Sequence, residues 1–136
     1  MPVTVYAEPY DTPVDAQRIA AHLAADPSIT HVAMVHNETT SGLVNDIEAA
    51  GAVAKRAGAA FIVDAMSSFG GIDIPVEDWG IDFIVSSANK CIQGVPGFSF
   101  AICRRDLLEG SRGKARSLSL DLYAQWQTME RDGGKW

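Results

Sequence analysis

Asp64 and Lys90 are the two residues of this chain whose types and positions suggest catalytic chemistry. Asp64 ends the apolar run AFIVD, and Lys90 follows the apolar run DFIVSS by three residues. A carboxylate at the end of a buried strand needs a cationic or hydrogen-bonding partner. Desolvation of a lysine favours the neutral, nucleophilic amine. Both residues are therefore candidates for a reactive site.

The chemistry of pyridoxal 5'-phosphate (PLP) makes two matching demands on a protein. An acid pairs with the pyridine nitrogen, and a lysine captures the aldehyde. These two positions lie on different parts of one flat ring, which suits residues at the ends of different strands. The spacing alone also allows two simpler interpretations, in which Asp64 and Lys90 form an ion pair or Lys90 is a surface loop residue.

The elements that must position these residues alternate along the chain. A first helix is expected from Thr12 as cap, with Pro13 in its first turn, to about residue 25, where Asp26-Pro27 stops it. Asn45 is expected to cap a second helix that ends at Gly58. The remaining expected elements are strands over 31–36, 60–64, 82–87 and 98–104, a polar loop over 37–42, a helical turn over 75–79 and a helix over about 120–129.

This alternation predicts an α/β fold with a mostly parallel sheet flanked by helices. The strand runs VAMV, FIV and FIV lack polar alternation, which is expected when helices cover both faces of a sheet. The loop over 89–97 is too short for a parallel crossover, so the fourth strand is expected to run antiparallel. Ligands of such sheets bind outside the carboxyl ends of the strands.

Composition excludes several other classes of function. The chain has 136 residues, a net charge of -6, two cysteines and three histidines. We therefore expect one domain, with no basic surface for nucleic acid, no zinc site and no apolar stretch long enough to span a membrane. Two cysteines outside a disulfide framework fit a reducing compartment, and we expect a cytoplasmic protein.

Four longer strings carry a family resemblance. VHNETTSG, IVDAMSSFGGI, IVSSANKCIQGVPGF and ARSLSLDLYAQW resemble the 2-aminoethylphosphonate–pyruvate transaminases, which are class V aminotransferases of PLP fold type I. The resemblance is dense from about Ile29 to the C-terminus. It implies that residues 1–136 form a single partial domain, the central segment of the large domain of such an enzyme.

The resemblance implies roles for individual residues. Lys90 would bind PLP covalently and then act as base and acid in the proton shift. Asp64 would pair with the pyridine nitrogen, and Met66 would pack beneath the ring, although Met66 also fits an ordinary core position. Thr40 would bond the hydroxyl group of the ring.

Two further residues would approach the phosphate of the cofactor, Asn89 and Ser87. Ser87 also fits a plain strand-end cap. His36 opens the loop that carries Thr40, and it fits either a neighbour of the ligand or a satisfied buried histidine. Cys91 adjoins the lysine and fits a packed thiol better than a nucleophile.

The resemblance also implies a reaction and partners. The enzymes of this family move the amino group of 2-aminoethylphosphonate to pyruvate, giving phosphonoacetaldehyde and alanine, and they form homo-oligomers. They are much longer than 136 residues, and their glycine-containing phosphate loop and carboxylate-binding arginine have no counterpart in this sequence. The chain alone is therefore expected to be weakly active or inactive. Another class V transaminase, of the serine– or alanine–glyoxylate type, and a non-enzymatic folded remnant or oligomerising domain remain alternatives.

Overall fold

The computed structural model describes residues 2–134, and the chain divides into two compact units, Met1–Ile102 and Cys103–Trp136. The N-terminal unit holds two long helices, a small hairpin and nearly all of a four-stranded sheet. The C-terminal unit is helical. No helix among the described residues is both long and apolar enough to cross a membrane.

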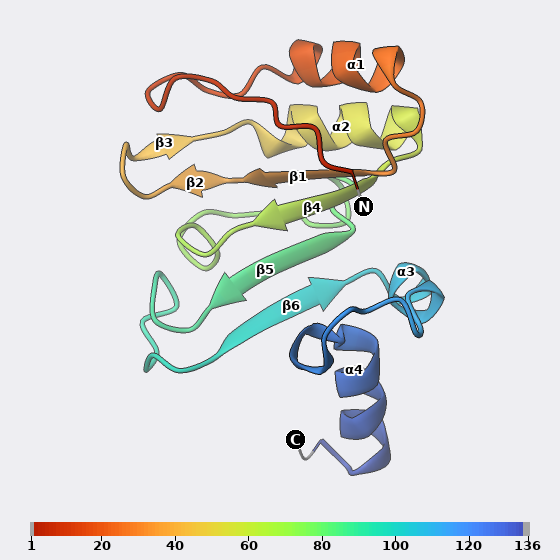
Figure 1. Cartoon of the computed structure of the whole chain (residues 1–136). Coiled ribbons are helices and arrows are strands. Elements are labelled where there is room, and N and C mark those ends of the chain that lie inside the picture. The colour runs from red at the N-terminus through yellow and green to blue at the C-terminus, as the bar shows by residue number, and fades with distance from the viewer. Residues whose placement is uncertain (1, 135–136) are drawn as a thin grey trace. The chain divides into compact units, whose positions relative to one another are not determined.

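The main sheet has the strand order β1-β4-β5-β6 (Figure 1). These strands span His31–Val35, Ala60–Asp64, Phe83–Ser87 and Ser99–Cys103. β1 pairs with β4 and β4 pairs with β5, both in parallel, while the arrow of β6 in Figure 1 points opposite to that of β5. The predicted mostly parallel sheet with a reversed fourth strand is therefore confirmed.

Two amphipathic helices, α1 (Ala16–Ala25) and α2 (Ile47–Ala57), lie side by side against this sheet (Figure 1). Both were predicted, but their caps were wrong. The side chain of Asp15 caps α1 by accepting a hydrogen bond from the amide of Gln17, so the helix starts three residues later than Pro13 suggested. Asp46 caps α2 through the amide of Ala49, and Gly58 ends it in the expected left-handed conformation.

Asn45 was predicted to cap α2, but its side chain instead bonds to two other segments. Its side-chain oxygen accepts from the amide of Val14 at 2.9 Å, and its side-chain nitrogen donates to the carbonyl of Val35 at 2.9 Å. One buried amide thus ties the segment before α1 to the end of β1. A single short side chain cannot cap α2 while it makes both of these bonds.

The hydrophobic core lies between the two helices and one face of the sheet. Phe61, Val63 and Ile84 point to this inner face and are completely buried, and they pack with helix residues such as Ile47 and Ala54. Because side chains alternate along a strand, the residues between them lie on the opposite, outer face. The residues of the outer face of β1, β4 and β5 are His31, Ala33, Val35, Ala60, Ile62, Asp64, Phe83, Val85 and Ser87.

The outer face differs from the prediction that helices cover both faces. Both long helices of the N-terminal unit pack on the inner face. On the outer face Val35 is exposed, and Ile62, Phe83 and Val85 are only half-buried. The continuous apolar runs were read correctly as buried strand sequence, but within this unit only one side of the sheet receives a helical layer.

Of two smaller elements, one differs from the prediction and one agrees with it. The segment expected to be a polar loop forms a short antiparallel hairpin of β2 (Asn37–Glu38) and β3 (Leu43–Val44), with Gly42 in the left-handed region at φ 71°. The expected turn before β5 is present, closed by a hydrogen bond from the amide of Trp79 to the carbonyl of Pro75.

The C-terminal unit contains α3 (Arg105–Gly110), a single 3-10 turn η1 (Leu118–Leu120) and α4 (Leu122–Arg131). α4 was predicted and lies two residues further along the chain, capped by the side chain of Asp121 on the amide of Ala124. α3 was missed. It has only six residues and no side-chain cap, so neither a long apolar period nor a cap signal marks it in the sequence.

Candidate functional site

The carboxyl end of β4 positions Asp64 on the outer face of the sheet. The carbonyl of Asp64 accepts from the amide of His36 at 2.8 Å, and the amide of Ala65 donates to the carbonyl of Val85 at 2.9 Å. One carboxylate oxygen accepts from the amide of Met66 at 2.9 Å. The acid is therefore held through its own backbone, the next peptide and its side chain.

The carboxyl end of β5 leads to Ser87, Asn89 and Lys90. Ser87 is 5% exposed, and its hydroxyl finds no hydrogen-bond partner among the described residues. Asn89 and Lys90 are exposed. Lys90 follows the buried residue Ala88 into an open loop, so within the described residues its exposure is that of the surface loop residue that the spacing also allowed.

The loop after Lys90 is compact. The amide of Gln93 donates to the carbonyl of Lys90, and the amide of Gly94 donates to the carbonyl of Ala88, both at 2.8 Å. Gln93 adopts a left-handed φ of 61°, a conformation that costs a non-glycine residue about 1 kcal/mol. A methyl group on Gly94 would lie 3.1 Å from the carbonyl oxygen of Ala88, so a glycine keeps this turn tight.

The hairpin loop brings two threonines to the same end of the sheet. Thr40 donates its hydroxyl to Glu38 at 2.9 Å, and its amide donates to the same carboxylate oxygen at 3.2 Å. These bonds, the amide of Thr40 first, lower the pKa of Glu38. The hydroxyl of Thr39, in contrast, lies 2.5 Å from that of Ser67 in the turn after β4.

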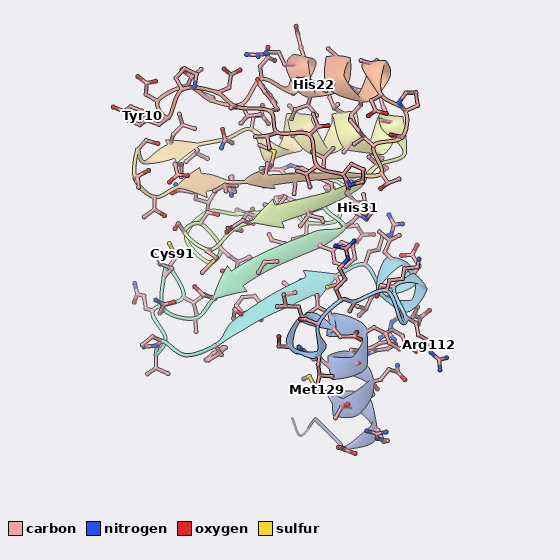
Figure 2. All side chains as sticks on the ribbon, viewed as in Figure 1. Tyr10, His22, His31, Cys91, Arg112 and Met129 are labelled. Atoms are coloured by element: carbon pink, nitrogen blue, oxygen red, sulfur yellow. The ribbon has the colours of Figure 1, made fainter. Side chains whose placement is uncertain are left out.

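Three segments meet at Ser67. Thr39, in the hairpin, contacts the hydroxyl of Ser67. Cys91, in the loop after β5, donates its thiol hydrogen to the carbonyl of Ser67, with an S–O distance of 3.4 Å. Figure 2 shows Cys91 at the end of the sheet where β4 and β5 finish. The segments that carry Thr40, Asp64 and Lys90 are therefore linked to one another through a single residue.

His36 lies beneath this edge of the sheet. It is 3% exposed, and its Nδ1 atom lies 2.9 Å from the hydroxyl of Ser68. Burial lowers the pKa of His36, which favours the neutral imidazole. The structure thus gives His36 the contacts of a satisfied buried histidine, one of the two interpretations left open by the sequence.

Met66 was predicted to pack beneath a cofactor ring. It is 37% exposed and follows Asp64 by two residues in the same turn. An exposed methionine beside a carboxylate does not behave as a core residue, which leaves the apolar side chain available to a ligand.

The residues at this edge fit PLP in chemical type. They supply a carboxylate, a primary amine and the buried hydroxyl of Ser87, whose donor remains unused within residues 2–134. A buried hydroxyl without a partner is costly, and an external acceptor such as a phosphate oxygen would satisfy it. Asp64 ends β4, Ser87 ends the adjacent strand β5, and Lys90 follows β5 by three residues.

A cavity of about 460 Å³ lies elsewhere, beside α1 and β1. Its walls include Tyr6, His22 and Met34, but none of the predicted site residues. Its mostly apolar lining offers no carboxylate–amine pair, so it is not the candidate site.

Comparison with known proteins places this geometry in a family. The sequence pattern of the family described as Aminotransferase class-V matches residues 3–118 of this chain, so the chain belongs to that family. Over 122 residues it is 59% identical to the 2-aminoethylphosphonate–pyruvate transaminases of Salmonella agona and Salmonella typhimurium. That match covers 90% of this chain and 33% of each relative, so the chain spans about a third of their length.

Solved structures give the same result for the fold. Pyridoxamine-pyruvate aminotransferase from Mesorhizobium loti is 38% identical, with a TM-score of 0.73 over 78% of this chain and 27% of that chain. Ureidoglycine-glyoxylate aminotransferase from Bacillus subtilis is 27% identical, with a TM-score of 0.79 over 88% of this chain and 31% of that chain. The structure is therefore a partial aminotransferase fold, as the sequence predicted.

Sequence reasoning missed the parts played by Thr39, Ser67 and Ser68. All three are small polar residues beside stronger motif residues. Their contacts form only because the hairpin segment and the turn after β4 lie next to each other in the fold. The signal available in the sequence was the pair of serines that begins three residues after Asp64, the last residue of its strand. It indicates a turn but not its partners.

Proposed function

We propose that this chain is part of a PLP-dependent transaminase that moves the amino group of 2-aminoethylphosphonate to pyruvate, giving phosphonoacetaldehyde and alanine. The single observation that carries the proposal is the placement of Asp64 at the end of β4 and of Lys90 three residues after the adjacent parallel strand β5, which itself ends in the buried hydroxyl of Ser87. The 59% identity to relatives of that name supports the substrate pair.

Each residue has a role in this proposal. When bound, PLP supplies the electron sink for moving an amino group between two carbon skeletons. The amine of Lys90 holds the cofactor and moves the proton at its Nζ atom. The carboxylate of Asp64 pairs with a protonated ring nitrogen, since an adjacent negative charge favours the protonated form. Met66 supplies an apolar surface beside the ring.

In this proposal the polar residues of the site orient PLP. The hydroxyl of Ser87 and the side-chain amide of Asn89 donate hydrogen bonds to phosphate oxygens, and Thr40 bonds the ring hydroxyl. Thr40 already donates to Glu38, so it must rotate or share its proton to do this. Small-molecule amino donors and 2-oxo acids are the partners in this proposal.

The chain alone is proposed to be weakly active or inactive. Lys90 and Asn89 are exposed, so the described residues do not hold the amine in a dry, fixed position. Positioning of reacting groups supplies much of an enzyme's rate advantage. Formation of alanine from the two substrates by the purified chain, at a rate typical of transaminases, would contradict this part of the proposal.

A different class V transaminase, of the serine– or alanine–glyoxylate type, is the second candidate. The structural similarity to a glyoxylate aminotransferase from Bacillus subtilis favours it, although at 27% identity against 59% for the phosphonate relatives. Substrate profiling of a full-length relative separates the two, because only the phosphonate enzyme needs a site for a phosphonate dianion.

A homo-oligomer in the cytoplasm is also part of the proposal. The outer face presents exposed Val35 beside half-buried Ile62, Phe83 and Val85, and apolar surface of this kind favours association. The free thiols Cys91 and Cys103 fit a reducing compartment. Light scattering after size exclusion tests the association, and a monomer at high concentration would exclude it. A remnant that oligomerises but binds no PLP is the non-enzymatic alternative.

The deciding experiment is a PLP titration followed by borohydride reduction and peptide mapping. The proposal expects a new absorbance band from the bound cofactor and a label fixed on Lys90. Lys90→Ala is expected to lose both, while Lys55→Ala, at an exposed lysine on α2, retains them. A label scattered over several lysines in the unchanged chain would refute a specific cofactor site.

A further inference from the structure

The turn that follows β4 is the structural support of Asp64. It spans residues 64–69 and is called the Asp64 turn below. Within it, Met66 donates to the carboxylate of Asp64 at 2.9 Å, and the amides of Ser68 and Phe69 donate to the carbonyl of Ala65 at 3.1 and 2.9 Å. The direction of the carboxylate therefore depends on how the whole turn is held.

One residue outside the turn binds it at both ends. The backbone amide of His36 donates to the carbonyl of Asp64 at 2.8 Å, and its Nδ1 atom lies 2.9 Å from the hydroxyl of Ser68. The first bond extends the ladder between β1 and β4 and needs no particular side chain. The second bond is specific to the imidazole and reaches the far side of the turn.

The burial of this pair argues that the contact matters. His36 is 3% and Ser68 1% exposed, and a polar side chain at such a position is costly unless it is hydrogen-bonded. An aliphatic residue would fill the same space without that cost. Burial also favours the neutral imidazole, which has one donor and one acceptor and so matches a hydroxyl in either direction.

A second contact joins the same two segments. The hydroxyl of Thr39 lies 2.5 Å from that of Ser67, three residues after His36 and one residue before Ser68. The start of the hairpin and the Asp64 turn are thus connected by two neighbouring side-chain bonds. Of these, the bond of His36 is the buried one, and water does not compete with it.

We propose that His36 is a positioning residue: through the hydroxyl of Ser68 it holds the Asp64 turn in the geometry that points the Asp64 carboxylate to the outer face of the sheet. The role of that carboxylate toward PLP rests on the proposed function. The geometry of the turn itself does not, so the two are tested separately.

The test uses four variants and begins without cofactor. Ser68→Ala and His36→Leu remove the bond from either side, and His36→Asn keeps a short polar group near the position of Nδ1. Ser111→Ala is the control, because it also removes one serine hydroxyl with a backbone partner, the carbonyl of Leu108 at 2.6 Å, but makes no bond to the Asp64 turn. The readout is hydrogen exchange at the amides of Met66 and Phe69, measured by NMR.

In Ser68→Ala and His36→Leu we expect both amides to exchange about tenfold faster, the effect of losing one buried hydrogen bond. The amide of Ala54, in the middle of α2, is expected to keep its protection and so reports that the fold is intact. Ser111→Ala and His36→Asn are expected to stay within about threefold of the unchanged chain. Unchanged exchange in Ser68→Ala, or an equal acceleration in Ser111→Ala, would overturn the proposal.

If His36→Leu does not fold, His36→Ala takes its place, because Ser68→Ala also removes the long contact of the Ser68 hydroxyl with the carbonyl of Ala65 at 3.5 Å and does not separate the two contacts. The same variants are then titrated with PLP, with the cofactor absorbance as readout. Weaker binding in Ser68→Ala but not in Ser111→Ala supports the role toward the cofactor. If the unchanged chain binds no PLP while exchange responds as expected, the positioning of the turn stands and the proposed function of this chain fails.

Discussion

Asp64 on β4 lies directly opposite Val85 on β5 in the parallel register of the sheet. Ser87 follows Val85 by two residues on the same face, so from the spacings of a β-sheet its Cα atom lies about 8 Å from that of Asp64. The carboxylate of Asp64 and the hydroxyl of Ser87 thus lie on the same face of the sheet. Their separation suits contacts with opposite ends of a small aromatic ligand. This relationship generates the first two predictions.

Ser87→Ala is expected to have opposite effects on stability and on cofactor binding. Its buried hydroxyl finds no acceptor in the described part of the chain, so its removal raises the free energy of unfolding by about 1 kcal/mol without ligand. The same change lowers the affinity for PLP about tenfold, because one hydrogen bond to a charged group is lost. Urea unfolding and a PLP titration measure the two effects.

Ser86→Ala is the control for this prediction. Ser86 has a partner in the carbonyl of Ala65, so its loss is expected to lower stability by about 1 kcal/mol and to leave PLP affinity unchanged. A loss of stability in Ser87→Ala equal to that in Ser86→Ala would show that the hydroxyl of Ser87 is already satisfied.

Asp64→Asn separates the structural from the chemical part of the carboxylate. An asparagine oxygen still accepts from the amide of Met66, so the free energy of unfolding is expected to change by less than about 0.5 kcal/mol. The negative charge that favours a protonated pyridine nitrogen is lost, so the pH dependence of the absorbance of bound PLP shifts toward lower pH. Asp64→Ala loses both and is expected to cost about 1 kcal/mol. A spectrum of Asp64→Asn identical to that of the unchanged chain would argue against this pairing.

Gly51→Ala is expected to be strongly destabilising. A methyl group on Gly51 would lie 2.0 Å from the carbonyl oxygen of Trp79 and 3.3 Å from the ring of Phe61, so α2 must move off the sheet. We expect a loss of more than about 2 kcal/mol, measured by thermal and urea unfolding. Gly110→Ala, at a helical glycine with open space around it, is the matched change and is expected to gain up to about 1 kcal/mol of local helix stability. Equal effects of the two changes would contradict the close packing at Gly51.

The lowered pKa of His36 predicts a pH dependence of stability. The unfolded chain takes up a proton near the ordinary histidine pKa of 6.5, whereas the folded chain does so only at lower pH because the imidazole is buried. The free energy of unfolding is therefore highest, as far as His36 is concerned, above pH 6.5. It decreases as the pH falls from 6.5 toward the lowered pKa of the folded chain, and below that pKa it no longer changes through His36. Urea unfolding between pH 5 and 8, compared with His36→Asn, measures this slope. A slope that persists unchanged in His36→Asn would assign it to other groups.

The sequence predicted most of the sheet and only part of the site. Continuous apolar runs located β1 and β4 almost to the residue, because burial of a strand leaves a strong local pattern. The caps of α1 and α2 were misjudged, since several adjacent residues have capping side chains and tertiary contacts decide among them. Asn45 illustrates this, because its bonds to Val14 and Val35 depend on segments far apart in the chain.

The exposure of Lys90 could not be decided from the sequence. A buried strand before a residue does not determine how much of the following loop is covered, and here the loop turns outward directly after Ala88. The contact of Thr39 with Ser67 was equally beyond sequence reasoning. It depends on the relative position of two loops that are separated by 28 residues.

Within the N-terminal unit, the helical layer on only one face of the sheet has a consequence for the thermodynamics of unfolding of that unit. The outer face keeps Val35 in contact with water and Ile62, Phe83 and Val85 partly so, even in the native state. Unfolding therefore hydrates less new apolar surface per residue than in a protein whose sheet is covered twice. Its heat-capacity increment should fall below the usual value of roughly 12–15 cal/mol/K per residue, which gives a flatter stability curve. A broad calorimetric transition of low enthalpy would then be a property of the native architecture.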